Sequence, residues 1–318
     1  MKSSMIVHPD ELSKDWIDRL ADAGISTIGL HPCGGDEAFD CLVNLMERLQ
    51  TKEYRDLIDY AHARGLSVEY EFHGMGYLLR RNLFAAHPEY FRINQDGERT
   101  SDYNMCVSND EALDVVAKAA VTLAKSLYGT THNFYFWLDD GHSRYCHCPK
   151  CKDLSPSDQQ LIVLNKMLKE IRKEIPDAKM AFLAYMDTLE PPTKVKADDG
   201  IFLEYAPFKK YIAKGEEAPP LIAHEAAMIS PLVETFKDKE KKVLEYWYDN
   251  SLFSRWKKPP QKFELDRELL FSDIPKYKEA GFNYMSTFAC FLGKDYEDLY
   301  GKVDVSEFGK ALKQTEKR

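Results

Sequence analysis

The 318-residue sequence lacks any hydrophobic run long enough to cross a membrane, and it has no low-complexity tract. It also lacks a basic stripe. The chain has 43 Lys and Arg but 52 Asp and Glu, so its formal net charge is -9. We therefore expect no nucleic-acid partner and no anionic membrane partner. Hydrophobic residues make up 44% of the chain, which is enough to fill the core of one large domain or two ordinary ones.

Cysteine is scarce, and its number is odd. The seven cysteines, three of them within residues 146–151, fit reduced thiols better than a disulfide framework. Cys33, Cys41 and Cys290 look like isolated apolar positions. Residues 1–5 lack the apolar core of a signal peptide. These observations predict a cytoplasmic protein, unless an export signal has been removed from the N-terminus.

Predicted strands and helices alternate along the whole chain. The expected strands are residues 5–8, 25–30, 66–73, 134–138, 179–186, 200–206, 243–250 and 282–291. The expected helices are residues 9–24, 36–49, 52–64, 108–128, 157–175, 224–236, 265–280 and 305–313, with Ser108 and Ser157 as N-caps. Eight strands, each followed by helical sequence, predict an α/β fold, a (β/α)8 TIM barrel. An open doubly wound sheet would give the same alternation. We expect one domain over residues 1–318, with a long loop at 74–107 and a Cys-rich loop at 141–156.

The third predicted strand separates polar from apolar side chains. Its polar face carries Ser67, Glu69, Glu71 and His73. Helices cover the outside of a barrel, so this face should point into the lumen. Buried carboxylates are costly unless they are paired or functional. We expect Glu71 and His73, nearest the strand end, to be functional. Glu204, Glu245 and Asp249 are candidates to join the lumen from other strands.

The chemistry of the chain is concentrated after the fourth predicted strand. That apolar strand runs directly into Asp139, Asp140 and Gly141. An α/β enzyme usually presents its acids to a substrate at the carboxyl edge of the sheet. The alternative is that Asp-Asp-Gly only forms a turn.

Several motifs carry a resemblance to a known family. They are residues 69–73, 87–91, 97–99, 106–109, 140–141, 145–151, 157–158, 183–185 and 191–192. In this order they resemble the family of domain of unknown function 4838, and Cys-x-Cys-x-x-Cys at 146–151 is the most specific of them. The family is similar to glycoside hydrolase family 163, whose members resemble endo-acting β-N-acetylglucosaminidases on N-glycans. The resemblance implies a catalytic TIM barrel with a carbohydrate substrate.

A glycosidase of this kind needs a protonated carboxyl beside the leaving oxygen. In substrate-assisted enzymes the 2-acetamido oxygen of the sugar is the nucleophile. Such barrels resemble one another in two neighbouring acid or amide residues after the fourth strand. Asp139 would orient the acetamido group, and Asp140 would act as the general acid. The remaining candidates for substrate binding are Glu71, His73, Tyr185, Glu204, Tyr205 and Trp247. Aromatic residues in a barrel also belong to the core, and Glu204 is alternatively the partner of a nearby Arg.

Three thiols within six residues suggest a soft-ligand metal site. Cys146, Cys148 and Cys151 would be joined by Cys106, with His142 and His147 as rivals for the fourth position. Four protein ligands would make a bound Zn structural. The alternative is a cluster of free thiols. We expect no organic cofactor.

Two other functions remain open. A metal-dependent sugar isomerase or deacetylase would use His8, His31, Glu71, His73 and Asp140 as ligands. A glycan-binding barrel without catalysis is the other alternative.

Overall fold

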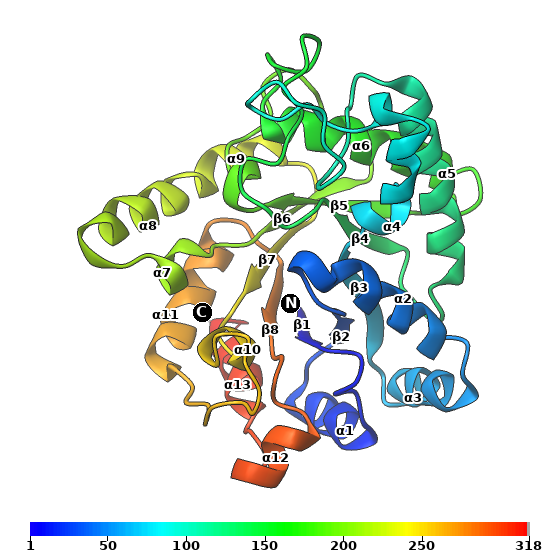
Figure 1. Ribbon diagram of the computed structural model, residues 1–318. Helices are drawn as coiled ribbons and strands as arrows, with labels where there is room; N and C mark the ends of the chain where they lie inside the picture. Colours follow the sequence, from blue (N-terminus) through cyan, green and yellow to red (C-terminus); the bar gives the residue numbers. More distant parts are fainter. Residues whose placement is uncertain (317–318) are drawn as a thin grey trace.

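The computed structural model describes residues 1–316, and its eight strands form a closed barrel (Figure 1). The strands are β1 (Lys2–Val7), β2 (Thr27–Leu30), β3 (Ser67–His73), β4 (Asn133–Trp137), β5 (Lys179–Ala184), β6 (Ile201–Tyr205), β7 (Lys241–Glu245) and β8 (Tyr284–Phe288). Each strand pairs in parallel with the next, and β8 pairs with β1. The predicted (β/α)8 barrel is confirmed, because an open sheet would leave β1 and β8 apart.

Helices surround the barrel (Figure 1). They are α1 (Lys14–Ala23), α2 (Ala38–Arg48), α3 (Lys52–Ala63), α4 (Met75–Leu78), α5 (Asp110–Ser126), α6 (Pro156–Ile171), α7 (Lys209–Ile212), α8 (Ala218–Ala227), α9 (Ile229–Thr235), α10 (Asn250–Phe253), α11 (Arg267–Glu279), α12 (Lys294–Tyr300) and α13 (Ser306–Glu316). Short 3-10 helices lie at 35–37, 81–85, 88–90, 186–188 and 215–217. Within residues 1–316, none of the helices has the length and apolar character that a membrane span requires.

Several helices begin at residues other than those predicted, and three of them show why. The first begins at Lys14, because the hydroxyl of Ser13 accepts a hydrogen bond from the backbone of the first turn. Asn109, not Ser108, caps α5. A capping box at Ser155 starts α6. Each cap lies one to four residues from the predicted start of its helix, because several neighbouring polar residues satisfy the same capping pattern.

The core has two parts, separated by the wall of the barrel. The outer part packs the strands against the helices and includes Tyr70 and Phe72 of β3. The inner part fills the lumen with alternate residues of the strands, namely Ile6, Tyr135, Trp137, Ala181, Leu183, Phe202, Leu244 and Phe288. The polar face of β3 points inward as predicted, since the Glu69 carboxylate accepts hydrogen bonds from Tyr135 (2.8 Å) and Tyr284 (2.9 Å).

Two carboxylates predicted to bind substrate form an ion cluster inside the lumen. The Lys242 Nζ lies 2.6 Å from Glu71 and 3.0 Å from Glu204, and none of the three side chains is exposed. Burial raises the pKa of Glu71, and the charge of Lys242 is the largest effect that opposes this rise and favours the carboxylate. Burial alone would lower the pKa of Lys242, but the two carboxylates raise it, so the lysine stays charged. The prediction that Glu71 and Glu204 contact substrate is wrong, because Lys242 pairs them in a sealed interior.

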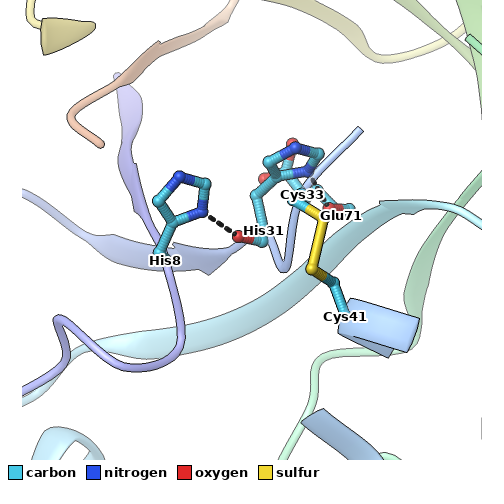
Figure 2. Close-up of a disulfide and its surroundings, with 5 residues drawn as sticks. All are labelled: His8, His31, Cys33, Cys41 and Glu71. Carbon is cyan, nitrogen blue, oxygen red and sulfur yellow. Dashed lines mark hydrogen bonds between the residues drawn. A yellow bond between two sulfur atoms is a disulfide. The ribbon is translucent and has the colours of Figure 1, made fainter. Parts of the chain in front are cut away.

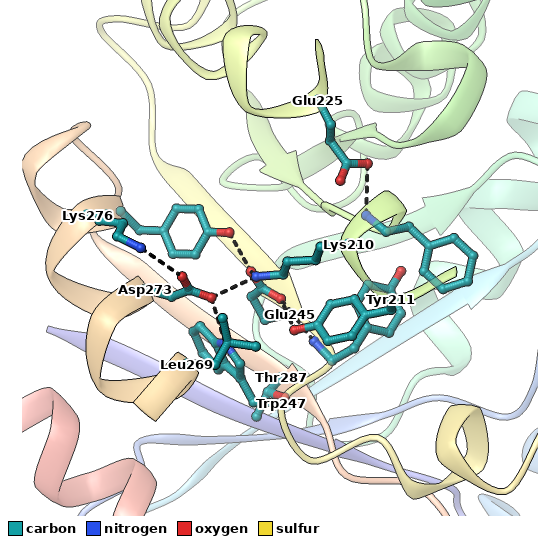
Figure 3. A network of polar contacts seen from close by, with 12 residues as sticks. Lys210, Tyr211, Glu225, Glu245, Trp247, Leu269, Asp273, Lys276 and Thr287 are labelled. Atoms are coloured by element: carbon teal, nitrogen blue, oxygen red, sulfur yellow. Dashed lines mark hydrogen bonds and ion pairs between the residues drawn. The ribbon is translucent and has the colours of Figure 1, made fainter. Parts of the chain in front are cut away.

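Glu245 lies on the outer face of β7, and not in the lumen where it was a candidate (Figure 3). Its carboxylate is 2.5 Å from the Lys210 Nζ and accepts a 2.7 Å hydrogen bond from the Tyr211 hydroxyl. The same lysine lies 2.7 Å from Asp273 of α11. This buried cluster joins β7 to α7 and α11.

Candidate active site

Two cavities open at the carboxyl ends of the strands. The mouth cavity has a volume of about 610 Å³, and its lining includes the rings of His8, His31, His73, Trp137, Tyr185, Phe208, Tyr246 and Phe288. The side cavity, about 630 Å³, is lined by residues that include Phe39, Arg80, Arg81, Asn82, Asp102, Tyr103 and Asp139. Gly35, Asp36, His73 and Asp140 line both. The two cavities therefore adjoin, and Asp140 and His73 lie where they meet.

Asp140 follows β4 by three residues and contacts both cavities. Tyr185, which follows β5, lines the mouth cavity together with Asp140. Burial, followed by the charge of Asp140, raises the pKa of Tyr185 well above its usual range, so the phenol stays protonated. A Cβ at Gly34 would lie 3.3 Å from Asp140 Oδ2 and 3.4 Å from the His73 ring. The absence of a side chain at Gly34 thus leaves the space around Asp140 open.

Asp139 is held by the long loop between β3 and α5. Its Oδ2 forms an ion pair with Arg81 and accepts a 2.6 Å hydrogen bond from the Asn104 backbone. The Asp139 backbone in turn donates to the Asn104 side chain at 2.9 Å. Asp139 lines the side cavity but not the mouth cavity. This arrangement fixes the segment that carries Asp140.

Three histidines lie at the carboxyl ends of β1 to β3 and form one wall of the mouth cavity. His8 donates from Nδ1 to the His31 carbonyl at 2.8 Å, and His31 donates likewise to the Glu71 carbonyl at 2.8 Å (Figure 2). His73 donates to the Leu138 carbonyl at 2.6 Å. A carbonyl can only accept, so each Nδ1 carries a proton. Burial lowers the pKa of His31 well below its usual range, and this ring is therefore neutral.

A disulfide joins Cys33 to Cys41, and the prediction of reduced, isolated thiols is wrong for this pair (Figure 2). The 3-10 turn at 35–37 brings the start of α2 back toward the loop after β2, with 6.0 Å between the two Cα atoms. Residues 33–37 line the mouth cavity, so the disulfide fixes part of its wall. Such bonds persist mainly in oxidising compartments, which weakens the basis of the cytoplasmic prediction.

Tyr205 and Trp247 do not reach either cavity, so their prediction as substrate-binding residues is wrong. Tyr205 is 1% exposed and donates to the Glu225 carbonyl at 3.0 Å. Trp247 is 3% exposed and donates to Asp273 of α11 at 3.2 Å. The seventh strand ends at Glu245, five residues before the predicted end, and Trp247 lies on the outer side of the barrel.

Sequence reasoning missed Tyr246 and underrated Asp249, which both line the mouth cavity. Burial raises the pKa of Tyr246 well above its usual range, and the charges of Asp249 and Asp140 add to this effect. Asp249 caps α10, accepting from the backbone of Ser251 at 3.1 Å. Burial raises the pKa of Asp249. Alternation of side chains along β7 could have indicated Tyr246. Lys242 and Leu244 point into the lumen, and Tyr246 is the next residue on the same side.

The ligand set of the metal-dependent alternative does not come together. Within residues 1–316, two groups of His, Cys, Asp and Glu have ligand atoms close enough to hold a metal. One is Cys33, Glu37 and Cys41, whose cysteines form the disulfide. The other is the four predicted cysteines, Cys106, Cys146, Cys148 and Cys151. The rival His142 instead pairs with Asp187, and the rival His147 is exposed and outside the group.

The family model for the domain of unknown function DUF4838 matches residues 43–242, which is more than half of the chain. The chain belongs to this family. No curated protein matches the sequence significantly.

Solved structures of glycosidases share the barrel fold. A β-galactosidase from the psychrophilic Marinomonas ef1 has a TM-score of 0.57 at 10% identity, over 99% of this chain and 59% of that one. A GH20 catalytic module of the pneumococcal exo-β-D-N-acetylglucosaminidase has a TM-score of 0.51 at 13% sequence identity, over 99% of this chain and 84% of that one. Endo-glycoceramidase II from Rhodococcus sp. has a TM-score of 0.53 at 12% sequence identity, over 97% of this chain and 78% of that one. Identities this low show a common fold.

Proposed function

We propose that this protein is a glycoside hydrolase that cleaves glycans containing N-acetylglucosamine, with Asp140 as the general acid. The observation that carries the proposal is the place of Asp140, which lines both adjoining cavities at the carboxyl end of β4. A general acid must face the glycosidic oxygen, which lies between the sugar being cleaved and the leaving group. A carboxyl at the junction of two cavities meets this requirement.

The lining of the cavities suggests which part of the substrate each would hold. The mouth cavity presents Trp137, Tyr185 and Tyr246, and aromatic faces suit the C–H surfaces of a sugar ring. The side cavity presents Arg80, Asn82 and other polar groups, which suit the hydroxyls of a leaving sugar. The cleaved sugar would therefore lie over the barrel and the leaving group over the long loop.

We assign the nucleophile to the 2-acetamido oxygen of the substrate, giving a retaining, substrate-assisted reaction. This oxygen attacks C1 while Asp140 transfers its proton to the leaving oxygen, and a cyclic oxazolinium forms. Water then opens this intermediate, and Asp140 takes the proton back. Asp139 fixes the segment that carries Asp140 through its contacts with Arg81 and Asn104. In the mouth cavity, Asp249 is the buried carboxyl available to accept from the acetamido N–H.

The same pair of carboxyls supports a second mechanism. Asp140 and Asp249 line one cavity and follow different strands, β4 and β7. In a two-carboxylate retaining glycosidase, the second carboxylate attacks C1 and forms a glycosyl-enzyme. In that case the substrate would need no 2-acetamido group.

Turnover of matched aryl glycosides tests the proposal. We expect hydrolysis of the aryl N-acetylglucosaminide, little or no hydrolysis of the aryl glucoside, and release of fragments from N-glycans. Two results together would favour the two-carboxylate mechanism. Both aryl substrates would be turned over equally, and azide would restore the activity of Asp249→Ala. Binding of glycan fragments without any turnover would instead identify a glycan-binding barrel.

A further inference from the structure

We propose that Cys106, Cys146, Cys148 and Cys151 bind one Zn²⁺ that stabilises the loops beside the candidate active site. All four thiols are buried, and all their sulfur atoms lie within 4.8 Å of one another. They come from two distant segments, since Cys106 lies in the long loop after β3 and the others follow β4. This inference does not depend on the proposed glycosidase activity.

The spacing of the sulfur atoms fits a tetrahedral metal site. Zn–S bonds of about 2.3 Å in a tetrahedron place neighbouring sulfurs about 3.8 Å apart. The Sγ atoms of Cys106 and Cys148 are 3.7 Å apart. A disulfide would require about 2.05 Å and would join the thiols in pairs. Four sulfurs around one point are therefore arranged for a shared ligand, and four protein ligands leave no open position for catalysis.

Hydrogen-bond donors surround the sulfur atoms. The Ile93 backbone N–H points to Cys146 Sγ at 3.5 Å. The Ser108 hydroxyl lies 3.3 Å from Cys106 Sγ and 3.5 Å from Cys148 Sγ. Such second-layer contacts orient metal-bound thiolates and offset part of their negative charge. The cluster thus has both the ligands and the surroundings of a structural zinc site.

The site would join the two loops that position Asp139 and Asp140. Cys106 is two residues beyond Asn104, whose backbone and side chain hold Asp139. Cys146 is six residues beyond Asp140 and is anchored to α6 by a reciprocal pair of 3.0 Å hydrogen bonds with Gln159. A metal bound between these segments would fix the junction of the two cavities.

Metal analysis of the whole chain, purified without added metal, tests this inference. We expect about one Zn per chain, released when a mercurial reagent modifies the thiols. Replacement by Co²⁺ should give the intense visible bands of tetrahedral thiolate coordination. Cys148→Ser should lower zinc content severalfold and lower the melting temperature, whereas Cys290→Ser, at a buried free thiol outside the cluster, should retain the zinc.

Two outcomes would overturn the inference. One is less than a tenth of an equivalent of metal after reconstitution with Zn²⁺, together with no Co²⁺ spectrum. The other is one equivalent of iron with the absorption of an iron–thiolate centre, since a four-sulfur site also suits iron. The Co²⁺ titration uses the unmodified protein, so the result holds even if Cys148→Ser fails to fold.

Discussion

The Nζ of Lys242 lies 2.6 Å from the carboxylate of Glu71 inside the barrel, and neither side chain is exposed. Glu204 completes the cluster from β6, directly beside Lys242 in the strand register. Lys242→Met would leave two carboxylates without their cation. Breaking a buried pair from one side typically costs about 3–5 kcal/mol. We expect a loss of that size in the free energy of unfolding, measured with urea.

The control for Lys242 is an exposed pair. Lys52 lies 2.7 Å from Asp56 at the surface of α3. Exposed pairs contribute little to stability because water and salt screen them, so Lys52→Met should leave the free energy of unfolding almost unchanged. Similar effects of the two substitutions would contradict a structural role for the lumen cluster.

The barrel could be predicted because its pattern repeats eight times. Errors of a few residues at strand ends do not change the count, and the polar face of β3 correctly indicated the lumen. The roles of individual lumen residues could not be predicted in the same way. Glu71 has a lysine partner 171 positions away, and such a partner is invisible in the local pattern of β3.

The same distinction, between what a local pattern shows and what depends on distant contacts, applies to the residues of the candidate site. Asp140 and His73 could be found because each ends or follows a strand that is recognisable on its own. Trp247 was misplaced because it alternates in phase with Glu245, a lumen candidate, whereas the lumen side of β7 carries Leu244 and Tyr246. The Cys33–Cys41 disulfide depends on a 3-10 turn whose geometry the cysteine count does not reveal.

Glu11 should make stability depend on pH. Burial raises its pKa to about 8, above the ordinary value of 4.5. The folded state therefore holds this proton more tightly than the unfolded state does. The associated stability is fully present below pH 4.5 and is lost as the pH rises toward 8. We expect the melting temperature to fall across this range, and to fall less in Glu11→Gln. An equal slope in both proteins would contradict the assignment.

Removal of the disulfide should affect substrate binding. Cys33→Ser with Cys41→Ser frees residues 33–37, which line the mouth cavity. The short closed loop contributes about 2–3 kcal/mol to stability in the chain-entropy model. We expect a lower melting temperature and a KM raised severalfold, because the cavity wall becomes less ordered. An unchanged KM would mean that this wall does not contact the substrate.

Arg81 should act through Asp139. Arg81→Ala removes the ion pair that holds Asp139 and should lower kcat about 10–100-fold for every leaving group, as a loss of orientation does. Arg80→Ala is the matched control, because Arg80 lines the same cavity but packs over the Phe39 ring. That variant should change KM more than kcat. If both variants changed only KM, Arg81 would be a substrate contact and not a positioning residue.

The assignment of Asp140 is tested by the dependence of turnover on the leaving group. General acid catalysis typically contributes about 10²–10⁴-fold, so Asp140→Asn should lose that much on natural linkages. Activated aryl glycosides need no proton on the departing oxygen and should be hydrolysed much faster than natural linkages by the same variant. If Asp140→Asn lost equal activity on both substrate types, the proton donor would be another group, and Asp249, the buried carboxyl of the mouth cavity, would be the next residue to replace.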